Sequence, residues 1–321
     1  MALLRDSPDD FSVLVERVAD HLGYPLAFVE RDYWITEILR SLAAPIDGYA
    51  ASVIFKGGTS LSKGWRLLQR MSEDVDIIVT FGHGVSLGGR DRVLKLLVER
   101  VEQDIGIPST AKTSEKSVHR SRYFEYPQQH SNVALTGQRV LLELGTRGGP
   151  EPHRRLPVRS LLAEIACAEF GVPANEFFEF VPVEIDTLAA ERTLFEKLAA
   201  LHDLAETAVV DERKYENLGT RLRHAYDVAM LLQHEETFTA LSSLRLAPLL
   251  EDIESRSSEN GWAWTPRPTG GFAESAAFAP QFIEHKAVVD AYARVMELVV
   301  GGPKPSLSDI VAIVRSRAEV L

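Results

Sequence analysis

The chain has 321 residues, 45% hydrophobic and 25% charged, which is typical of a folded globular protein with a sizeable buried core. A single cysteine, Cys167, excludes an intrachain disulfide and favours a cytoplasmic protein, and no segment approaches the roughly 20 apolar residues of a membrane span. The formal net charge of -11 argues against a protein that binds nucleic acid over its whole surface.

The first part of the chain mixes helices with short strands. Ser7-Pro8 is a typical helix start, and the apolar residues behind it recur at helical spacing. Further helices are predicted for residues 26–42, 59–70, 90–105 and 159–170. Strands rich in β-branched and aromatic residues are predicted for residues 52–56, 75–79, 122–127, 139–145 and 180–185.

The second part reads as helical. Helices are predicted for residues 189–206, 221–233, 285–300 and 307–320, with a long loop over 255–278. We therefore predict a mixed α+β fold. Residues 1–186 would form N-terminal helices and a small α/β domain with a sheet and flanking helices, and residues 187–321 a helical domain.

Two aspartates stand at the start of a predicted strand. Because strand side chains alternate between faces, Asp74 and Asp76 point the same way. Two adjacent carboxylates repel each other unless a cation lies between them, and Mg²⁺ is the natural partner. Glu143 could add a third carboxylate if its strand neighbours theirs. Three carboxylates holding two metal ions would support phosphoryl or nucleotidyl transfer.

A glycine pair lies between a predicted strand and a predicted helix. The backbone N–H groups of Gly57 and Gly58 could approach a phosphate closely, with added donors from Thr59 and Ser60. Lys63 lies one turn further and could neutralise phosphate charge. The spacing differs from that of a P-loop, and taken alone such a glycine pair is usually a tight turn.

Three other polar positions have two interpretations each. Ser72 could cap the strand locally or bond a phosphate oxygen of a nucleotide. Lys197 lies at the edge of an apolar helix stripe, where it could extend to solvent or reach a triphosphate. Arg223 and Asp227 are spaced i, i+4, as in an ordinary ion pair on a helix surface.

The stretch from Phe55 to Val79 closely resembles the signature of the polymerase-β-type nucleotidyltransferase superfamily, G[GS] followed by D-x-D. More narrowly, the chain resembles the AbiEii/MenT family, the toxins of type IV toxin–antitoxin and abortive-infection systems. Three further segments, "RDYWITEIL" at 31–39, "LFEKLAAL" at 194–201 and "RHAYDVAMLL" at 223–232, resemble motifs of that family in order.

This resemblance implies Mg²⁺-dependent transfer of a nucleoside monophosphate from an NTP to the 3′ end of tRNA, which blocks translation. It also implies a cognate antitoxin encoded nearby. In that interpretation the carboxylates hold metal and polarise the acceptor hydroxyl, while the glycine stretch and Lys197 hold the triphosphate. Asp227 would anchor Lys197 or an active-site base, with Arg223 in support.

Two segments of the sequence are candidates for binding an RNA acceptor. The segment 109–159 carries nine Lys and Arg against four acids, a local charge of +5, and is the predicted RNA path. The exposed loop 255–278, with Trp262 and Trp264, is a second candidate for stacking on bases. Alternatives are a small-molecule or protein hydroxyl as acceptor, or a non-catalytic nucleotide-binding regulator.

Overall fold

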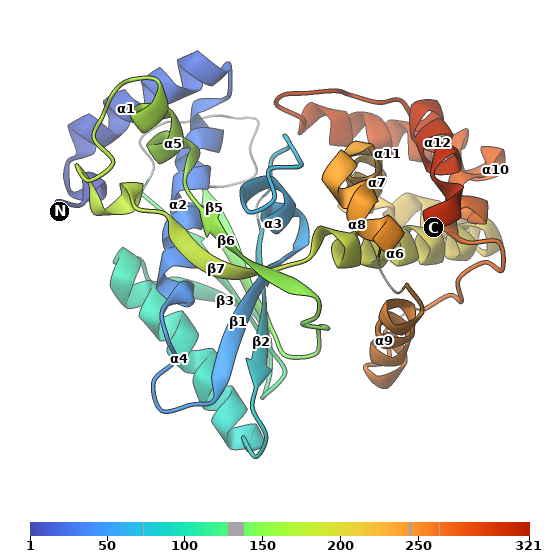
Figure 1. Cartoon of the computed structure of the whole chain (residues 1–321), viewed down its shortest axis with the longest axis horizontal. Helices are drawn as coiled ribbons and strands as arrows, with labels where there is room; N and C mark the ends of the chain where they lie inside the picture. Colours follow the sequence, from blue (N-terminus) through green and yellow to red (C-terminus); the bar gives the residue numbers. More distant parts are fainter. Residues whose placement is uncertain (73, 128–137, 244–245, 263) are drawn as a thin grey trace. The chain divides into compact units, whose positions relative to one another are not determined.

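The computed structural model describes residues 1–72, 74–127, 138–243, 246–262 and 264–321. The chain forms two compact units (Figure 1). The first contains Met1–Trp65 and Ser72–Leu188, and the second contains Arg66–Met71 and Ala189–Leu321. Among the described residues, no helix is both long and apolar enough to cross a bilayer.

The first unit is built on a mixed sheet, and its described strands follow one another in the order β3-β4-β5-β2-β1-β7-β6. Strand β2 runs parallel to β5, and β1 runs parallel to β7, whereas the other neighbours are antiparallel. The strands are β1 (Ala51–Lys56), β2 (Asp74–Phe81), β3 (Ser109–Glu115), β4 (His119–Glu125), β5 (Arg139–Gly145), β6 (His153–Val158) and β7 (Val183–Leu188). The predicted domain boundary after residue 186 falls inside β7.

Two of these strands were not expected from the sequence, and both lie at the edges of the sheet. Strand β3 reads Ser-Thr-Ala-Lys-Thr-Ser-Glu, and nearly all of its residues are exposed. Strand β6 (His-Arg-Arg-Leu-Pro-Val) is half polar, and three of its six residues are exposed. An edge strand pairs on one side only and can remain solvated, so it lacks the apolar alternation by which central strands are recognised.

Helices cover one face of this sheet (Figure 1). They are α1 (Pro8–Leu22), α2 (Leu26–Ala43), α4 (Leu87–Ile105) and α5 (Leu161–Ala168). Their apolar side chains pack in one core against alternate strand residues such as Phe55, Val75 and Leu142. Strand alternation therefore turns the intervening residues, Asp74 and Asp76 among them, to the opposite face.

Helix α3 (Gly57–Lys63) follows β1 directly and is shorter than predicted. The sequence predicted a helix over residues 59–70, and that prediction is wrong beyond Lys63. Gly64 follows the helix, and Arg66 adopts a left-handed conformation with φ of 57°, which stops helical propagation. The next residues, Arg66–Met71, then belong to the second unit.

The described residues of the second unit form helices and loops, with one isolated bridge and no strand, and α7 packs against both α6 and α12. Its helices are α6 (Ala190–Val210), α7 (Arg223–Gln233), α8 (Glu235–Ser243), α9 (Leu246–Glu259), α10 (Pro280–Ile283), α11 (Lys286–Glu297) and α12 (Leu307–Ser316). The predicted mixed α+β class is confirmed.

The predicted loop over residues 255–278 is only partly a loop. Helix α9 continues to Glu259, and 3₁₀ turns occupy Phe272–Glu274 and Ala276–Phe278. Phe272 is buried against Phe195 of α6, so this part of the segment belongs to the helical core. Residue 263 of the segment lies outside the described residues.

Candidate active site

Three carboxylates lie on the face of the sheet opposite the helix-covered core. Strand β2 pairs with β5 so that Asp76 stands beside Glu143 and Asp74 beside Leu141. Paired residues on neighbouring strands share a face, and alternation puts Asp74 on that face as well. The next residues of β2, Val75 and Ile77, point into the core. The fold thus brings Asp74, Asp76 and Glu143 together on one surface.

Gly57 makes room for one of these carboxylates. Its φ of +80° lies in the left-handed region, and a Cβ atom built on it would lie 2.3 Å from Oδ2 of Asp76. Any side chain would therefore both strain the backbone and collide with Asp76. Gly57 and Gly58 are the first two residues of α3, so the Asp76 carboxylate lies against the beginning of this helix.

The hydroxyl groups of this stretch bond within the protein. Thr59 donates to the carbonyl oxygen of Asp74, and its hydroxyl lies 2.5 Å from that of Ser72. Ser60 donates to the carbonyl oxygen of Gly57 at 2.9 Å. Thr59 and Ser60 are both buried. These bonds fix the start of α3 against the start of β2, while contact of the hydroxyls with a nucleotide stays a prediction.

Lys63 is part of a buried ion pair. Its Nζ atom lies 2.5 Å from Oδ1 of Asp32 on α2 and also donates to the carbonyl oxygen of Arg159 at 3.3 Å. The other oxygen of Asp32 accepts the backbone N–H of Leu161 at 2.6 Å, at the start of α5. The ammonium group predicted to face phosphate is thus balanced by a carboxylate inside the unit.

Glu143 is held by Ser121, which the sequence did not single out, and by Lys112, which belongs to the predicted RNA path. Its Oε1 atom accepts from Oγ of Ser121 at 3.1 Å and from Nζ of Lys112 at 3.4 Å. The Ser121 hydroxyl is buried and lies 2.7 Å from Nε2 of His119. Both Ser121 and His119 lie on β4, whose antiparallel register sets Ser121 beside Glu143. Ser121 and Glu143 are more than twenty residues apart in sequence, so it is the pairing of β4 with β5 that brings them together.

The carboxylate face fits a divalent cation by its chemistry. Oxygen ligands from carboxylates are what Mg²⁺ prefers, and three of them share this surface. Among the described residues, no group of three or more His, Cys, Asp or Glu side chains is arranged to hold a metal ion. The match of Asp74, Asp76 and Glu143 to Mg²⁺ is one of donor type and shared face.

A second charged cluster lies inside the helical unit. Asp227 of α7 is fully buried, and its Oδ2 atom lies 2.7 Å from Nζ of Lys197 on α6. Arg70 binds the same carboxylate with two groups, Nε to Oδ1 at 2.6 Å and Nη2 to Oδ2 at 2.8 Å. Arg223, the first residue of α7, is close enough to act electrostatically on Lys197. One carboxylate is thus shared by two cations.

Burial controls the ionisation of this cluster. Burial lowers the pKa of Lys197, although Asp227 opposes that change. Burial disfavours the charged form of Asp227, but Arg70 and Lys197 outweigh it and hold the pKa of this carboxyl below its usual value. Burial and Lys197 lower the pKa of His224 well below its usual value, so the imidazole 3.4 Å from the ammonium is neutral near pH 7. No pattern in the sequence indicated a role for Arg70, although it lies only four residues before Asp74.

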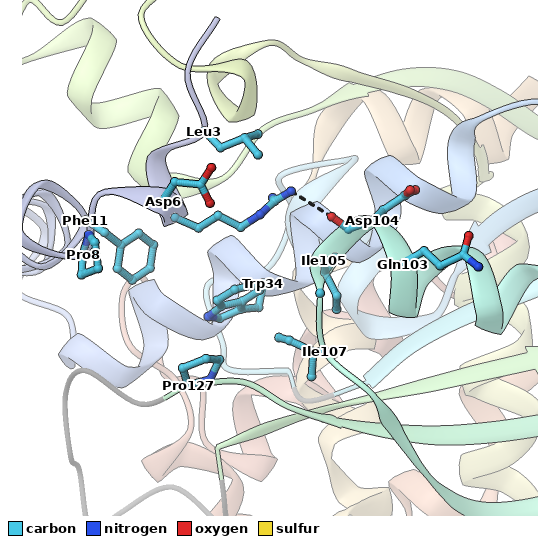
Figure 2. A pocket seen from close by; sticks show the side chains of 12 residues that line it. Leu3, Asp6, Pro8, Phe11, Trp34, Gln103, Asp104, Ile105, Ile107 and Pro127 are labelled. Carbon is cyan, nitrogen blue, oxygen red and sulfur yellow. Dashed lines mark hydrogen bonds between the residues drawn. The ribbon is translucent and has the colours of Figure 1, made fainter.

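The pocket of about 490 Å³ in the first unit shares no residue with the carboxylate face. Figure 2 shows its lining, in which Phe11, Trp34, Ile105 and Ile107 surround a space below the N-terminal segment. Arg5 also lines this pocket and donates to the carbonyl oxygen of Asp104 at 2.9 Å. This pocket lies among the helices α1, α2 and α4, so it is not the candidate active site.

Comparisons with known proteins identify the class to which this arrangement belongs. The family model described as "Nucleotidyl transferase AbiEii toxin, Type IV TA system" matches residues 38–311, well over half of the chain. The chain therefore belongs to the AbiEii family of nucleotidyltransferase toxins.

The fold is similar to that of a solved toxin. MenT4, a nucleotidyltransferase toxin from Mycobacterium tuberculosis H37Rv, superimposes with a TM-score of 0.57 at 17% sequence identity. The match covers 95% of this chain and 88% of MenT4. A comparison with curated proteins gives no match.

Proposed function

We propose that this protein is a Mg²⁺-dependent nucleotidyltransferase toxin that transfers a nucleoside monophosphate from an NTP to the 3′ end of tRNA and so blocks translation. In a type IV system it would act in the cytoplasm beside a cognate antitoxin. The observation that carries the proposal is the register of β2 and β5, which gathers Asp74, Asp76 and Glu143 on one face. A protein that only bound nucleotide would not need three carboxylates there.

The chemistry assigns a role to each carboxylate. Asp74 and Asp76 would hold Mg²⁺, which when bound supplies the positive charge that offsets the triphosphate. Glu143 would accept the proton of the acceptor hydroxyl. The acceptor oxygen then forms a bond to the α-phosphorus, the bond from that phosphorus to the β-phosphate oxygen breaks, and pyrophosphate leaves. Ser121 and Lys112 would orient the Glu143 carboxylate for this task.

The triphosphate would be held by two kinds of group. Gly57 and Gly58 would offer their backbone N–H groups at the start of α3, where Gly57 lies beside the Asp76 carboxylate. Lys197 would supply a cation, since both oxygens of Asp227 also accept hydrogen bonds from Arg70. Asp227 then positions Lys197, and Arg223 adds positive potential.

A transfer assay tests this proposal. Each of the four labelled NTPs is incubated with the protein and one pool of acceptors at a time. The pools are total tRNA, cell protein and small metabolites. Label in tRNA that requires Mg²⁺ and disappears on adding a chelator is the expected result. Label only in protein or metabolites would replace tRNA as the acceptor, and nucleotide binding without transfer to any pool would indicate a regulator.

Asp76→Asn should abolish transfer while leaving the fold intact. The substitution keeps the side-chain shape against Gly57 but removes a charged metal ligand. Asp47→Asn, at an exposed position outside the site, is the matched control. Normal turnover by the Asp76 variant would contradict the assignment, and melting curves of both variants would show whether the fold is retained.

A further inference from the structure

The basic segment 109–159 is divided by strand alternation into two groups that face opposite sides of the sheet. On β4, Arg120 and Arg122 flank Ser121, which faces Glu143. They therefore point to the helix-covered side, where Arg120 bonds Asp91 of α4 at 3.2 Å. Burial lowers the pKa of Arg122. These two arginines of the predicted RNA path are thus directed away from the carboxylates, and residues 128–137 lie outside the described residues.

The other group surrounds an aromatic ring on the carboxylate face. Tyr123 pairs with Leu141 in the β4–β5 register. It lies two residues from Ser121 on β4 and therefore on the same face as the Ser121–Glu143 pair. The guanidinium carbon of Arg139 lies 4.0 Å from the centre of the Tyr123 ring. The ammonium of Lys112 lies 5.7 Å from that centre and 3.4 Å from Glu143. Lys112 thus links the ring to the catalytic carboxylate.

Lys112 owes this position to an irregularity in β3. The pairing of β3 with β4 shifts between Ala111 and Thr113, so Lys112 is an extra residue in the edge strand. Such bulges redirect a side chain and are common beside active sites. The bulge gives an otherwise exposed, polar edge strand a specific cation at the carboxylate face.

We propose that Tyr123, Arg139 and Lys112 form a platform for the unpaired 3′ strand of an RNA acceptor, leading its terminal hydroxyl to Glu143. This inference rests on the proposed transfer to RNA and deepens it. Arg and Lys contact phosphates, and aromatic rings and guanidinium planes stack on unpaired bases. Arg139 and Glu143 are four residues apart on β5, about 13 Å along the strand. A polynucleotide strand spans that length, whereas a single phosphate group does not.

The charge of the protein makes such a local platform necessary. A chain of net charge -11 repels a polyanion overall, so RNA must be held by cations within about a Debye length, roughly 8–10 Å. The three carboxylates add local negative charge on the same face. Arg139 is exposed, and Lys112 has a side-chain exposure of 37%, so both cations can reach a phosphate group.

The test measures RNA binding directly, without NTP. Fluorescence anisotropy with unfractionated tRNA and with a short single-stranded RNA is compared for Tyr123→Ala, Tyr123→Phe and Arg139→Gln. Arg122→Gln is the matched control, because it removes the same charge from the neighbouring strand on the opposite face. Melting temperatures confirm that each variant is folded.

We expect Tyr123→Ala to weaken binding by about tenfold and Tyr123→Phe to retain it, since the ring supplies the stacking. Arg139→Gln should weaken binding and reduce the slope of log affinity against log salt by about 0.7, one single-strand phosphate contact. Arg122→Gln should leave both the affinity and the slope unchanged.

The outcomes separate this inference from the proposed function. Wild-type affinity and salt slope in Tyr123→Ala and Arg139→Gln would overturn the platform, even if the wild-type protein transfers nucleotide to tRNA. If Arg122→Gln weakened RNA binding as much as Arg139→Gln, the platform would also be overturned. Binding would then not depend on which face of the sheet carries the charge. Absence of label in any RNA would refute the proposed function, and absence of RNA binding by the wild-type protein would refute the platform as well.

Discussion

Within the part of the chain that the structure describes, each unit contains one buried pair of lysine and aspartate, and the two pairs differ in how the aspartate is shared. In the first unit Asp32 pairs with Lys63, and its second oxygen accepts a backbone N–H. In the helical unit Asp227 pairs with Lys197, but Arg70 already occupies both of its oxygens. The first lysine is needed to neutralise its aspartate, whereas the second is an additional cation.

From this difference we expect the Lys63–Asp32 pair to be structural and the Lys197–Asp227 pair to be functional. Burying charges costs free energy unless they are paired, so a lysine that is dispensable for pairing is retained at a cost. Burial indeed lowers the pKa of Lys197, which shows that its charged form is disfavoured by its surroundings. An anionic ligand such as a triphosphate would offset that cost. The sequence predicted phosphate binding for both Lys63 and Lys197. The difference between their two ion pairs leads us to expect it of Lys197.

The largest effect is expected from Lys63→Met. This substitution keeps the apolar stem but leaves the Asp32 carboxylate buried without its cation, which should cost about 3–5 kcal/mol of folding free energy. Chemical denaturation measures the loss. At a temperature where the variant is folded, its KM for NTP should equal that of the wild type. A raised KM with unchanged stability would reverse the roles of the two lysines.

Lys197→Met should show the opposite balance. Because Arg70 still holds both oxygens of Asp227, the free energy of unfolding should change little. Nucleotide use should fall, with kcat/KM for NTP lowered about a hundredfold, or about 2.7 kcal/mol of transition-state stabilisation. Steady-state kinetics and denaturation of the same preparation check both parts. Unchanged kinetics together with a lower melting temperature would make Lys197 a structural residue.

Arg70→Gln should make the Asp227–Lys197 pair similar to the Asp32–Lys63 pair. Asp227 would then depend on Lys197 alone, as Asp32 depends on Lys63. We expect a loss of about 2 kcal/mol in stability, because hydrogen bonds to a charged group disappear. We also expect about a tenfold loss in kcat/KM, one decade or 1.36 kcal/mol, as the ammonium is drawn to the aspartate. Wild-type kinetics in this variant would show that Arg70 does not govern Lys197.

The smallest effect concerns acid stability. The folded-state pKa of Asp227 lies below its unfolded value, so the unfolded chain binds more protons at low pH and stability falls as pH decreases. The contribution is complete above about pH 4, near the unfolded pKa of an aspartate, and declines below it by at most about 1.4 kcal/mol per pH unit. Asp227→Asn should unfold with a weaker pH dependence between pH 4 and 2. An identical dependence would contradict this assignment.

The sequence determined the central elements and the chemical character of the site. Strands β1, β2, β5 and β7 and helices α1, α2 and α4 follow from apolar periodicity, because buried elements must carry it. The alternation of Asp74 and Asp76 on one strand is likewise a local property. The polar edge strands β3 and β6 carry no such pattern, and the end of α3 depends on where Arg66–Met71 packs.

Only the tertiary structure decided which distant residues meet. The pairing of β5 with both β2 and β4 places Glu143 beside Asp76 and Ser121, and it separates Arg120 and Arg122 from Lys112 and Arg139. The partners of Lys63 and Lys197 likewise come from other helices, 31 and 30 residues away, and Arg70 is 157 residues from Asp227 in sequence. The sequence determines which side chains are charged. Tertiary packing determines which oppositely charged groups meet, because an ion pair forms only between groups that the fold brings within a few ångströms.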